Sequence, residues 1–168
     1  YDGSSISLVG ELNSGGSSAP RGMYSFDGKL YFQADDGTNG AELYQYDGSS
    51  ITLIEDIRPG SDSSSPQEFF GYNEKLYFQA NDGTNGAELH VFDPDTGAVS
   101  LFSDIRSGSS SSFPRELIEY QGELYFAADN DSGVERLWSF FSAAPTPPST
   151  STPAPPPYSG PIISGTEQ

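Results

Sequence analysis

The sequence predicts an all-β fold, and three observations support this prediction. The 168 residues include 19 Gly, 13 Pro, 10 Tyr and 11 Phe, a composition typical of domains rich in turns and strands. A fourteen-residue phrase recurs along the chain. Apolar and polar residues alternate around it with the period of two that strands require. We therefore expect three four-stranded, blade-like repeats in a propeller-like arrangement, with a β-trefoil as the alternative.

The recurring phrase divides the first part of the chain into three units. LYFQADDGTNGAEL begins at Leu30 and returns at Leu76, changed only where Asp35 becomes Asn81. A more divergent copy, LYFAADNDSGVERL, begins at Leu124. Repeats at such spacing indicate one supersecondary unit per copy. The repeat domain covers residues 1–141, with units at about 1–45, 46–91 and 92–141.

The second unit shows the expected order of elements most clearly. It has four segments in which apolar and polar residues alternate. The first contains Phe69, Phe70 and Tyr72, and the other three are KLYFQA, AELHVF and AVSLFS. In the first unit, Asp27 and Gly28 stand between the first two segments, and this dipeptide suits a type I′ hairpin turn. The stretches DIRPGSDSSSP (56–66) and DIRSGSSSSFP (104–114) then form long connections to the next unit.

The ends of the repeat domain do not match. The opening YDGSSISLV repeats the YDGSSITLI of residues 46–54, which contains the fourth strand of the first unit. No such strand follows Phe140. We expect the spare N-terminal strand to complete the last blade, either in the same chain by ring closure or in a neighbouring molecule by strand exchange, which gives a filament. The candidate residues for assembly are Ile6, Leu8, Val9, Ile162 and Ile163.

The repeat resembles the bacterial ELWxxDGT repeat family. The resemblance lies in LYFxAxDGTNGAEL, in the Tyr or Phe and Asp that follow it, and in the DIRPGS connection. The ELW position reads ELY at 42–44, ELH at 88–90 and RLW at 136–138. The resemblance covers residues 1 to about 141 and implies a surface or secreted bacterial protein with blade-like β repeats. It carries no catalytic or binding residues to these positions.

The chain beyond the repeats is a different kind of sequence. Residues 142–157 are all Ala, Pro, Ser or Thr. Such a segment cannot bury a core, and we expect an extended spacer with the composition of an O-glycosylated stalk. The candidate glycosylation sites are Thr146, Ser149, Thr150, Ser151 and Thr152. Residues 158–168 form a short C-terminal segment with a possible strand.

Charge and residue content exclude several classes of function. The formal charge is −17, which repels phosphate backbones, so nucleic acid is not an expected partner. No apolar run is long enough to span a bilayer. The chain has no cysteine and one histidine, His90, and that histidine takes the position of Tyr44 and Trp138, which predicts a packing role. We expect no enzyme activity, and an extracellular or cell-surface location.

Acidic side chains recur in the loop of each unit. Their oxygens suit Ca²⁺, although the spacing is not that of an EF-hand. Asp-Gly and Asn-Gly pairs are also what tight turns require, and this explanation is the stronger one. No cofactor is expected, and calcium is kept as an alternative. The weak candidates for calcium are Asp36, Asp82, Asp129, Asp131 and Glu135.

The sequence as a whole predicts a non-enzymatic extracellular structural or assembly module. Its partners are other copies of itself, in a homo-oligomer or filament, through strand exchange. The alternative is a carbohydrate-binding or calcium-dependent adhesin. In that interpretation Tyr44, Trp138 and the other strand aromatics stack on surface glycans, although aromatics at strand spacing more often pack in a core.

Overall fold

A computed structural model describes residues 5–141, and these residues form three antiparallel sheets without any helix. Sheet A contains β1 (Arg21–Phe26), β2 (Lys29–Asp35), β3 (Ala41–Tyr46) and β4 (Ile51–Glu55). Sheet B contains β5 (Gln67–Tyr72), β6 (Lys75–Asn81), β7 (Ala87–Asp93) and β8 (Ala98–Ser103). Sheet C contains β9 (Arg115–Tyr120), β10 (Glu123–Asp129) and β11 (Glu135–Phe140). Each strand pairs with the one before it.

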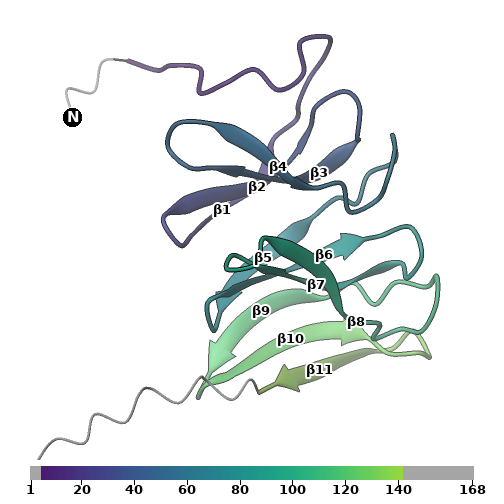
Figure 1. Cartoon of the computed structure of the whole chain (residues 1–168). Helices are drawn as coiled ribbons and strands as arrows, with labels where there is room; N and C mark the ends of the chain where they lie inside the picture. Colours follow the sequence, from purple (N-terminus) through teal and green to yellow (C-terminus); the bar gives the residue numbers. More distant parts are fainter. Residues whose placement is uncertain (1–4, 142–168) are drawn as a thin grey trace, which may run out of the picture.

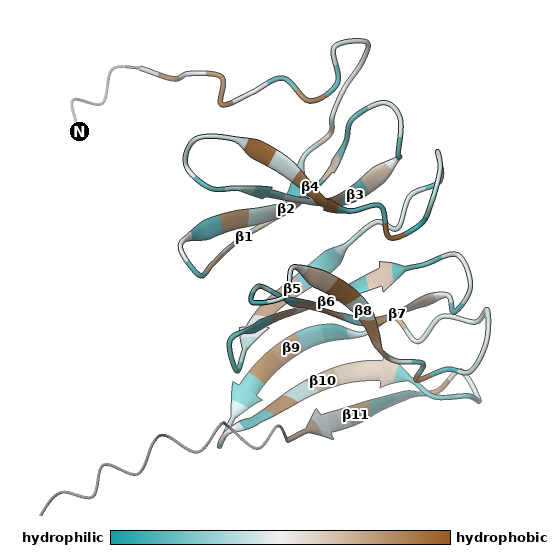
Figure 2. Ribbon diagram, viewed as in Figure 1, coloured by the Kyte–Doolittle hydropathy of each residue, from teal (hydrophilic) through white to brown (hydrophobic). Residues whose placement is uncertain are grey.

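The three sheets are stacked face to face in chain order, with sheet B in the middle (Figure 1). One cluster of buried side chains lies between sheets A and B, and a second lies between B and C. The strands carry most of the hydrophobic residues, whereas the connecting loops are mostly hydrophilic (Figure 2). The long connections at 56–66 and 104–114, which we call the first and second crossings, carry the chain from one sheet to the next.

The alternation in the LYF phrase places its residues on opposite faces of each sheet. In sheet B, Leu76 and Phe78 pack toward sheet A, and Tyr77 packs toward sheet C. The equivalent residues of sheet C follow the same rule, because Leu124 and Phe126 pack toward sheet B. Sheet B thus presents one face to sheet A and the other face to sheet C.

The hairpins between the first two strands have the predicted turn geometry. Asp27 and Gly28 both have positive φ, at 46° and 71°, as a type I′ turn requires. The equivalent turn of sheet B has φ angles of 47° at Asn73 and 62° at Glu74. Glu74 therefore adopts a left-handed conformation that favours glycine.

The structure confirms an all-β fold of repeated sheets, and sheet C has three strands where the others have four. Neither the expected ring closure nor a trefoil is formed by residues 5–141. The spare N-terminal segment forms no strand there, and it lies against sheet A, at the opposite end of the stack from sheet C (Figure 1). A single strand needs a partner for its hydrogen bonds. No helix in the described part of the chain is long and apolar enough to cross a membrane.

Candidate functional site

The repeated DGTNG loop is a turn held by its own aspartate. Asp36 Oδ1 accepts hydrogen bonds from the backbone N–H groups of Thr38 (2.8 Å) and Asn39 (2.9 Å), and Oδ2 accepts one from Asn39 Nδ2 (2.9 Å). The hydrogen bond from the backbone N–H of Asn39 is the main reason that the pKa of Asp36 is lowered. Asp82 makes the same three bonds in the second unit. These carboxylates stabilise the loop.

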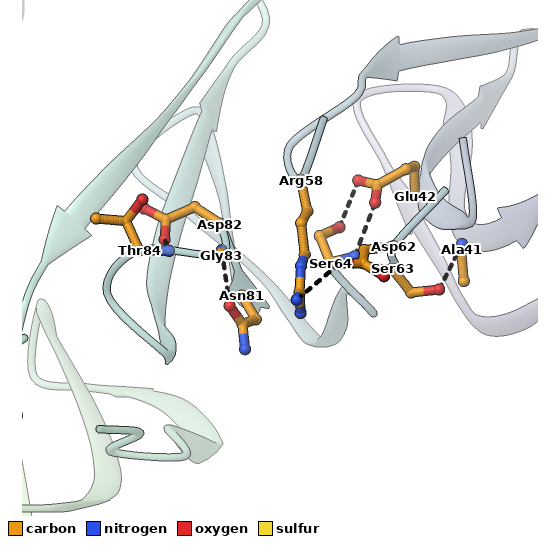
Figure 3. Close-up of polar contacts among 10 residues, drawn as sticks. All are labelled: Ala41, Glu42, Arg58, Asp62, Ser63, Ser64, Asn81, Asp82, Gly83 and Thr84. Carbon is orange, nitrogen blue, oxygen red and sulfur yellow. Dashed lines mark hydrogen bonds and ion pairs between the residues drawn. The ribbon is translucent and has the colours of Figure 1, made fainter. Parts of the chain in front are cut away.

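A buried glutamate beside this loop binds the first crossing. Glu42 lies in β3 and is fully buried. Its Oε2 accepts a hydrogen bond from the backbone N–H of Ile57 (3.0 Å). The same oxygen accepts one from Ser64 Oγ (2.5 Å), and Oε1 accepts one from the Ser64 N–H (2.7 Å) (Figure 3). Because Ile57 and Ser64 lie near the two ends of the crossing, one carboxylate fixes its path. We call this arrangement the glutamate clamp.

The second unit repeats the glutamate clamp. Glu88 is also fully buried. It accepts hydrogen bonds from the N–H groups of Ile105 (2.9 Å) and Ser112 (2.8 Å) and from Ser112 Oγ (2.6 Å). The same donors at equivalent positions show that the glutamates of the ELY and ELH motifs hold the crossings that follow them.

Each clamped crossing also binds the sheet that follows it. The carbonyl oxygen of Ser64 accepts a hydrogen bond from the N–H of Asn81 in β6 (2.9 Å), while Ser65 N–H donates to Ala41 O of β3 (3.0 Å). Arg58 of the same crossing packs on the turn at Gly83 and pairs with Asp62 (Figure 3). The crossing therefore joins sheets A and B through hydrogen bonds to both.

Glycine is required where the crossing approaches the loop. Gly40 and Gly86 have positive φ, at 70° and 74°. A Cβ atom at Gly40 would lie 2.7 Å from the carbonyl oxygen of Asp62 in the crossing, and one at Gly86 would overlap the carbonyl of Ser110. The second glycine of DGTNG thus serves the contact with the crossing as well as the turn.

Comparison with the third unit identifies the residues of the motif that bind the crossing. At the positions of Gly86 and Glu88 it has Val134 and Arg136, and both are exposed. No crossing follows β11 among residues 5–141. The residues that bind a crossing are therefore replaced in the unit that no crossing follows within the described part of the chain.

The buried position raises the pKa values of both clamp glutamates. Burial is the larger influence at Glu42 and Glu88, and the hydrogen bonds from the crossings oppose it. Asp56 adds a further upward shift at Glu42, because two negative charges lie near each other. Protonation of the two clamp glutamates is thus easier in the folded protein than in the unfolded chain.

His90 has the packing role that the sequence predicted. It is buried and stacks on Phe78, with ring centroids 6.1 Å apart, as Tyr44 stacks on Phe32 at 6.3 Å. Burial lowers its pKa. Its Nδ1 lies 3.2 Å from the carbonyl oxygen of Glu88. Trp138, at the same position in sheet C, donates from Nε1 to Ala128 O (3.1 Å). These aromatics pack between or against the sheets.

The five candidate calcium ligands are not brought together. No group of three or more His, Cys, Asp or Glu side chains in the described part of the chain is arranged to hold a metal ion. Asp36 and Asp82 bind their own loops in two different sheets. In the third unit, Asp131 accepts a hydrogen bond from Ser107 N–H (2.8 Å), and Glu135 pairs with Arg115. Asp129 lies at the end of β10.

The N-terminal segment occupies the place of a crossing in front of sheet A. Asp35 N–H donates to Ser18 O (2.9 Å), as Asn81 N–H donates to Ser64 O and Asp129 N–H to Ser112 O (2.7 Å). Ala19 has a positive φ like its equivalents Ser65 and Phe113. Gly10 faces Ile51. The segment therefore copies a crossing without a sheet before it.

An apolar groove of about 380 Å³ lies between this segment and the outer face of sheet A. Leu8, Val9 and Leu12 line one side, and Leu30 and Ile51 line the other. A second hollow, lined by acidic and aromatic residues including Asp27 and Glu74, lies beside the hairpin turns of sheets A and B.

Among the predicted assembly residues, Ile6, Leu8 and Val9 are exposed at the start of the described chain. Ile162 and Ile163, and the glycosylation candidates from Thr146 to Thr152, lie outside the described residues. Sequence reasoning did not identify Glu42 and Glu88 as clamps. The sequence does contain one signal for them, because the third unit has Arg136 at the equivalent position.

Neither protein-family models nor curated proteins match this sequence.

Proposed function

We propose that this chain is a non-enzymatic assembly module that joins copies of itself head to tail by strand donation. The N-terminal segment of one copy supplies the fourth strand of sheet C in the next. The resemblance to the ELWxxDGT repeats and the Ser/Thr/Pro tail favour an extracellular or cell-surface location, with the tail as a glycosylated spacer. Intact mass measurement of the natural protein tests the glycosylation, since attached glycans add mass.

The placement of residues 10–20 carries the proposal. Their contacts with sheet A copy those of the first crossing with sheet B, and β4 runs directly into that crossing. By this equivalence, residues 6–10 project to the position of a fourth strand in a sheet that would precede sheet A. Ile6 and Leu8 are exposed there. Sheet C has an open edge at β11 among the described residues, and a neighbouring copy can fill it by β-strand addition.

We take the register of the donated strand from the internal sheets. In sheet A, Tyr46 lies opposite Ile51 and Gln45 opposite Thr52. The same pairs in sheet B are Phe92 with Val99 and Val91 with Ser100. Applied to the junction, this register places Ile6 of one copy opposite Phe140 of the next, and Ser7 opposite Ser139.

Cysteine cross-linking tests this register, because the natural chain has no cysteine. Directly opposed residues of antiparallel strands have Cα atoms about 4.5–5.5 Å apart, within the range that a disulfide spans. We expect Ser7→Cys and Ser139→Cys variants to form a disulfide-linked dimer when they are mixed and oxidised. Ser100→Cys is the matched control, since Ser100 is an exposed serine on another edge strand, and it should not link to Ser7→Cys.

Removal of residues 1–9 gives an independent test. Sedimentation velocity should show oligomers of the full chain and a smaller species for the shortened chain, with circular dichroism confirming that both remain folded. A full chain that stays monomeric at high concentration, or equal oligomerisation of both forms, would contradict strand donation.

A further inference from the structure

Among residues 5–141, the outer faces of sheets A and C have no sheet packed against them, whereas each internal junction buries a cluster of side chains between two sheets. The outer face of sheet A, which we call the head face, includes Met23, Leu30, Tyr46 and Ile51. The outer face of sheet C, which we call the tail face, includes Ile118, Tyr120, Tyr125 and Leu137. Each residue of the head face has an equivalent in sheet B that packs toward sheet A, and each residue of the tail face has an equivalent in sheet B that packs toward sheet C.

Equivalent side chains are buried at the internal junctions and exposed on the head and tail faces. Leu43 and Leu89 are 0% exposed where they meet the following sheet, whereas Leu137 at the same position is 76% exposed. On the head face, Met23 is 62% exposed, and its equivalent Phe69, covered by sheet A, is 9% exposed. Large apolar side chains exposed together on a protein surface indicate an interaction site.

We propose that the tail face of one copy packs on the head face of a second copy, in the geometry of the internal junctions between sheets. This inference rests on the proposed head-to-tail assembly and adds to it a second contact, apart from the donated strand. Such a heterologous contact gives a closed ring when the rotation between copies closes, and an open filament when it does not.

The internal junctions define the contacts. Tyr31 of sheet A lies against Phe92 of sheet B, with ring centroids 5.7 Å apart, and Tyr77 lies against Phe140 at 6.3 Å. Continuing the series places Tyr125 of one copy against Tyr46 of the next.

The tail face already holds the arrangement that the internal junctions use. The ring centroids of Tyr120 and Tyr125 are 6.2 Å apart, and those of Tyr72 and Tyr77 in sheet B are 6.1 Å apart. Tyr72 Oη donates to Gly122 O across the junction of sheets B and C (2.6 Å). The equivalent bond at the new junction runs from Tyr120 Oη to Gly28 O of the second copy.

Charge also favours the contact between copies. At the first internal junction, Glu42 lies close to Asp56 of the crossing. At the proposed junction, Arg136 takes the position of Glu42, and Glu11 of the second copy takes the position of Asp56. A pair of opposite charges thus replaces a pair of like charges. This matters in a chain with a formal charge of −17, whose copies otherwise repel each other.

Two experiments test the face contact separately from strand donation. First, Tyr46→Cys and Tyr125→Cys variants are mixed and treated with a short bis-maleimide. We expect a covalent dimer from the mixture and none from either variant alone, because head-to-tail packing never places like faces together. A dimer from a single variant, or none from the mixture, overturns the proposal.

Second, Leu137→Asp places a charge on the tail face at a position that is already exposed, so the fold should persist. We expect this change to weaken self-association by at least about tenfold, since the side chain is buried at the proposed junction. Ser100→Asp, on the middle sheet, should leave association unchanged. Equal association of the two variants contradicts the face contact.

The two sets of cross-links separate the two proposals. Linkage between Ser7→Cys and Ser139→Cys without linkage between Tyr46→Cys and Tyr125→Cys overturns the face contact and leaves strand donation standing. The opposite result overturns strand donation alone. The absence of both linkages overturns the head-to-tail assembly itself.

Discussion

Replacing Glu88 with alanine tests the role of the glutamate clamp. The substitution removes the acceptor of three hydrogen bonds, from Ile105 N–H, Ser112 N–H and Ser112 Oγ, at 2.6–2.9 Å. Hydrogen bonds to charged groups contribute about 1.5–3 kcal/mol each, and losses within one network do not add. A buried donor left without an acceptor costs about 1–3 kcal/mol, so the loss of one acceptor shared by three donors should cost about 3–5 kcal/mol. We expect a loss in this range, which is a large part of the about 5–15 kcal/mol that holds a domain folded.

Urea unfolding followed by circular dichroism and by the fluorescence of Trp138, the single tryptophan, measures this loss. With a urea slope of about 2 kcal/mol per molar, the midpoint should fall by about 2 M. Arg136→Ala is the matched control, because Arg136 has the same place in its unit but is exposed, and it should change the free energy of unfolding by less than about 0.5 kcal/mol. A loss below about 1 kcal/mol for Glu88→Ala would refute the reasoning.

Glu74→Gly should stabilise the protein by about 0.5–1 kcal/mol, because it relieves a left-handed conformation, and an unchanged or lower melting temperature would contradict this. Gly86→Val should cost about 2–5 kcal/mol in urea unfolding, through its positive φ and the overlap with the second crossing, whereas a cost no larger than that of an exposed loop substitution would show that the crossing does not need glycine there. The pKa values of Glu42 and Glu88 are raised above the ordinary 4.5, so the stability that their protonated forms contribute is lost as pH rises through the raised values. The urea midpoint should therefore increase on acidification from pH 7 toward about 4.5, and it should increase less in Glu42→Gln. A decrease of the midpoint over this range would contradict the prediction. Because the loop aspartates bind their own backbone, the melting temperature should differ by less than about 1 °C between calcium and EDTA, and a larger rise with calcium would indicate a site.

The repeated strands were predictable because strand signals are local. The alternation around Leu30 and Leu76, and the Asp27–Gly28 turn, require only neighbouring residues to be understood. The clamp was not predictable in this way, because only the fold brings Ile57 and Ser64 to Glu42. A buried carboxylate with three donors depends on contacts distant in sequence.

The N-terminal strand shows a different limit of sequence reasoning. YDGSSISLV has the letters of a fourth strand, yet residues 5–9 form none in the single chain, since the edge that would pair with them is at the other end of the stack. Strand propensity does not by itself supply the hydrogen-bonding partner. The same letters in residues 46–54 include β4 because β3 lies beside them.

The replacements in the third unit carry information that the motif alone does not. Val134 and Arg136 stand where the other units have glycine and glutamate, and read in sequence alone they look like decay of the repeat. In the structure they lie in the unit that no crossing follows within residues 5–141. Degenerate copies of a repeat are thus a guide to where its internal contacts stop.

Electron cryomicroscopy of the assembled full chain tests the central claim of head-to-tail joining most directly. We predict that the map shows residues 6–9 of one copy as a strand antiparallel to β11 of the next, with Ile6 opposite Phe140 and the tail face covered by a head face. A monomer, or an assembly in which the β11 edge remains unpaired and Leu137 remains exposed, would contradict this account.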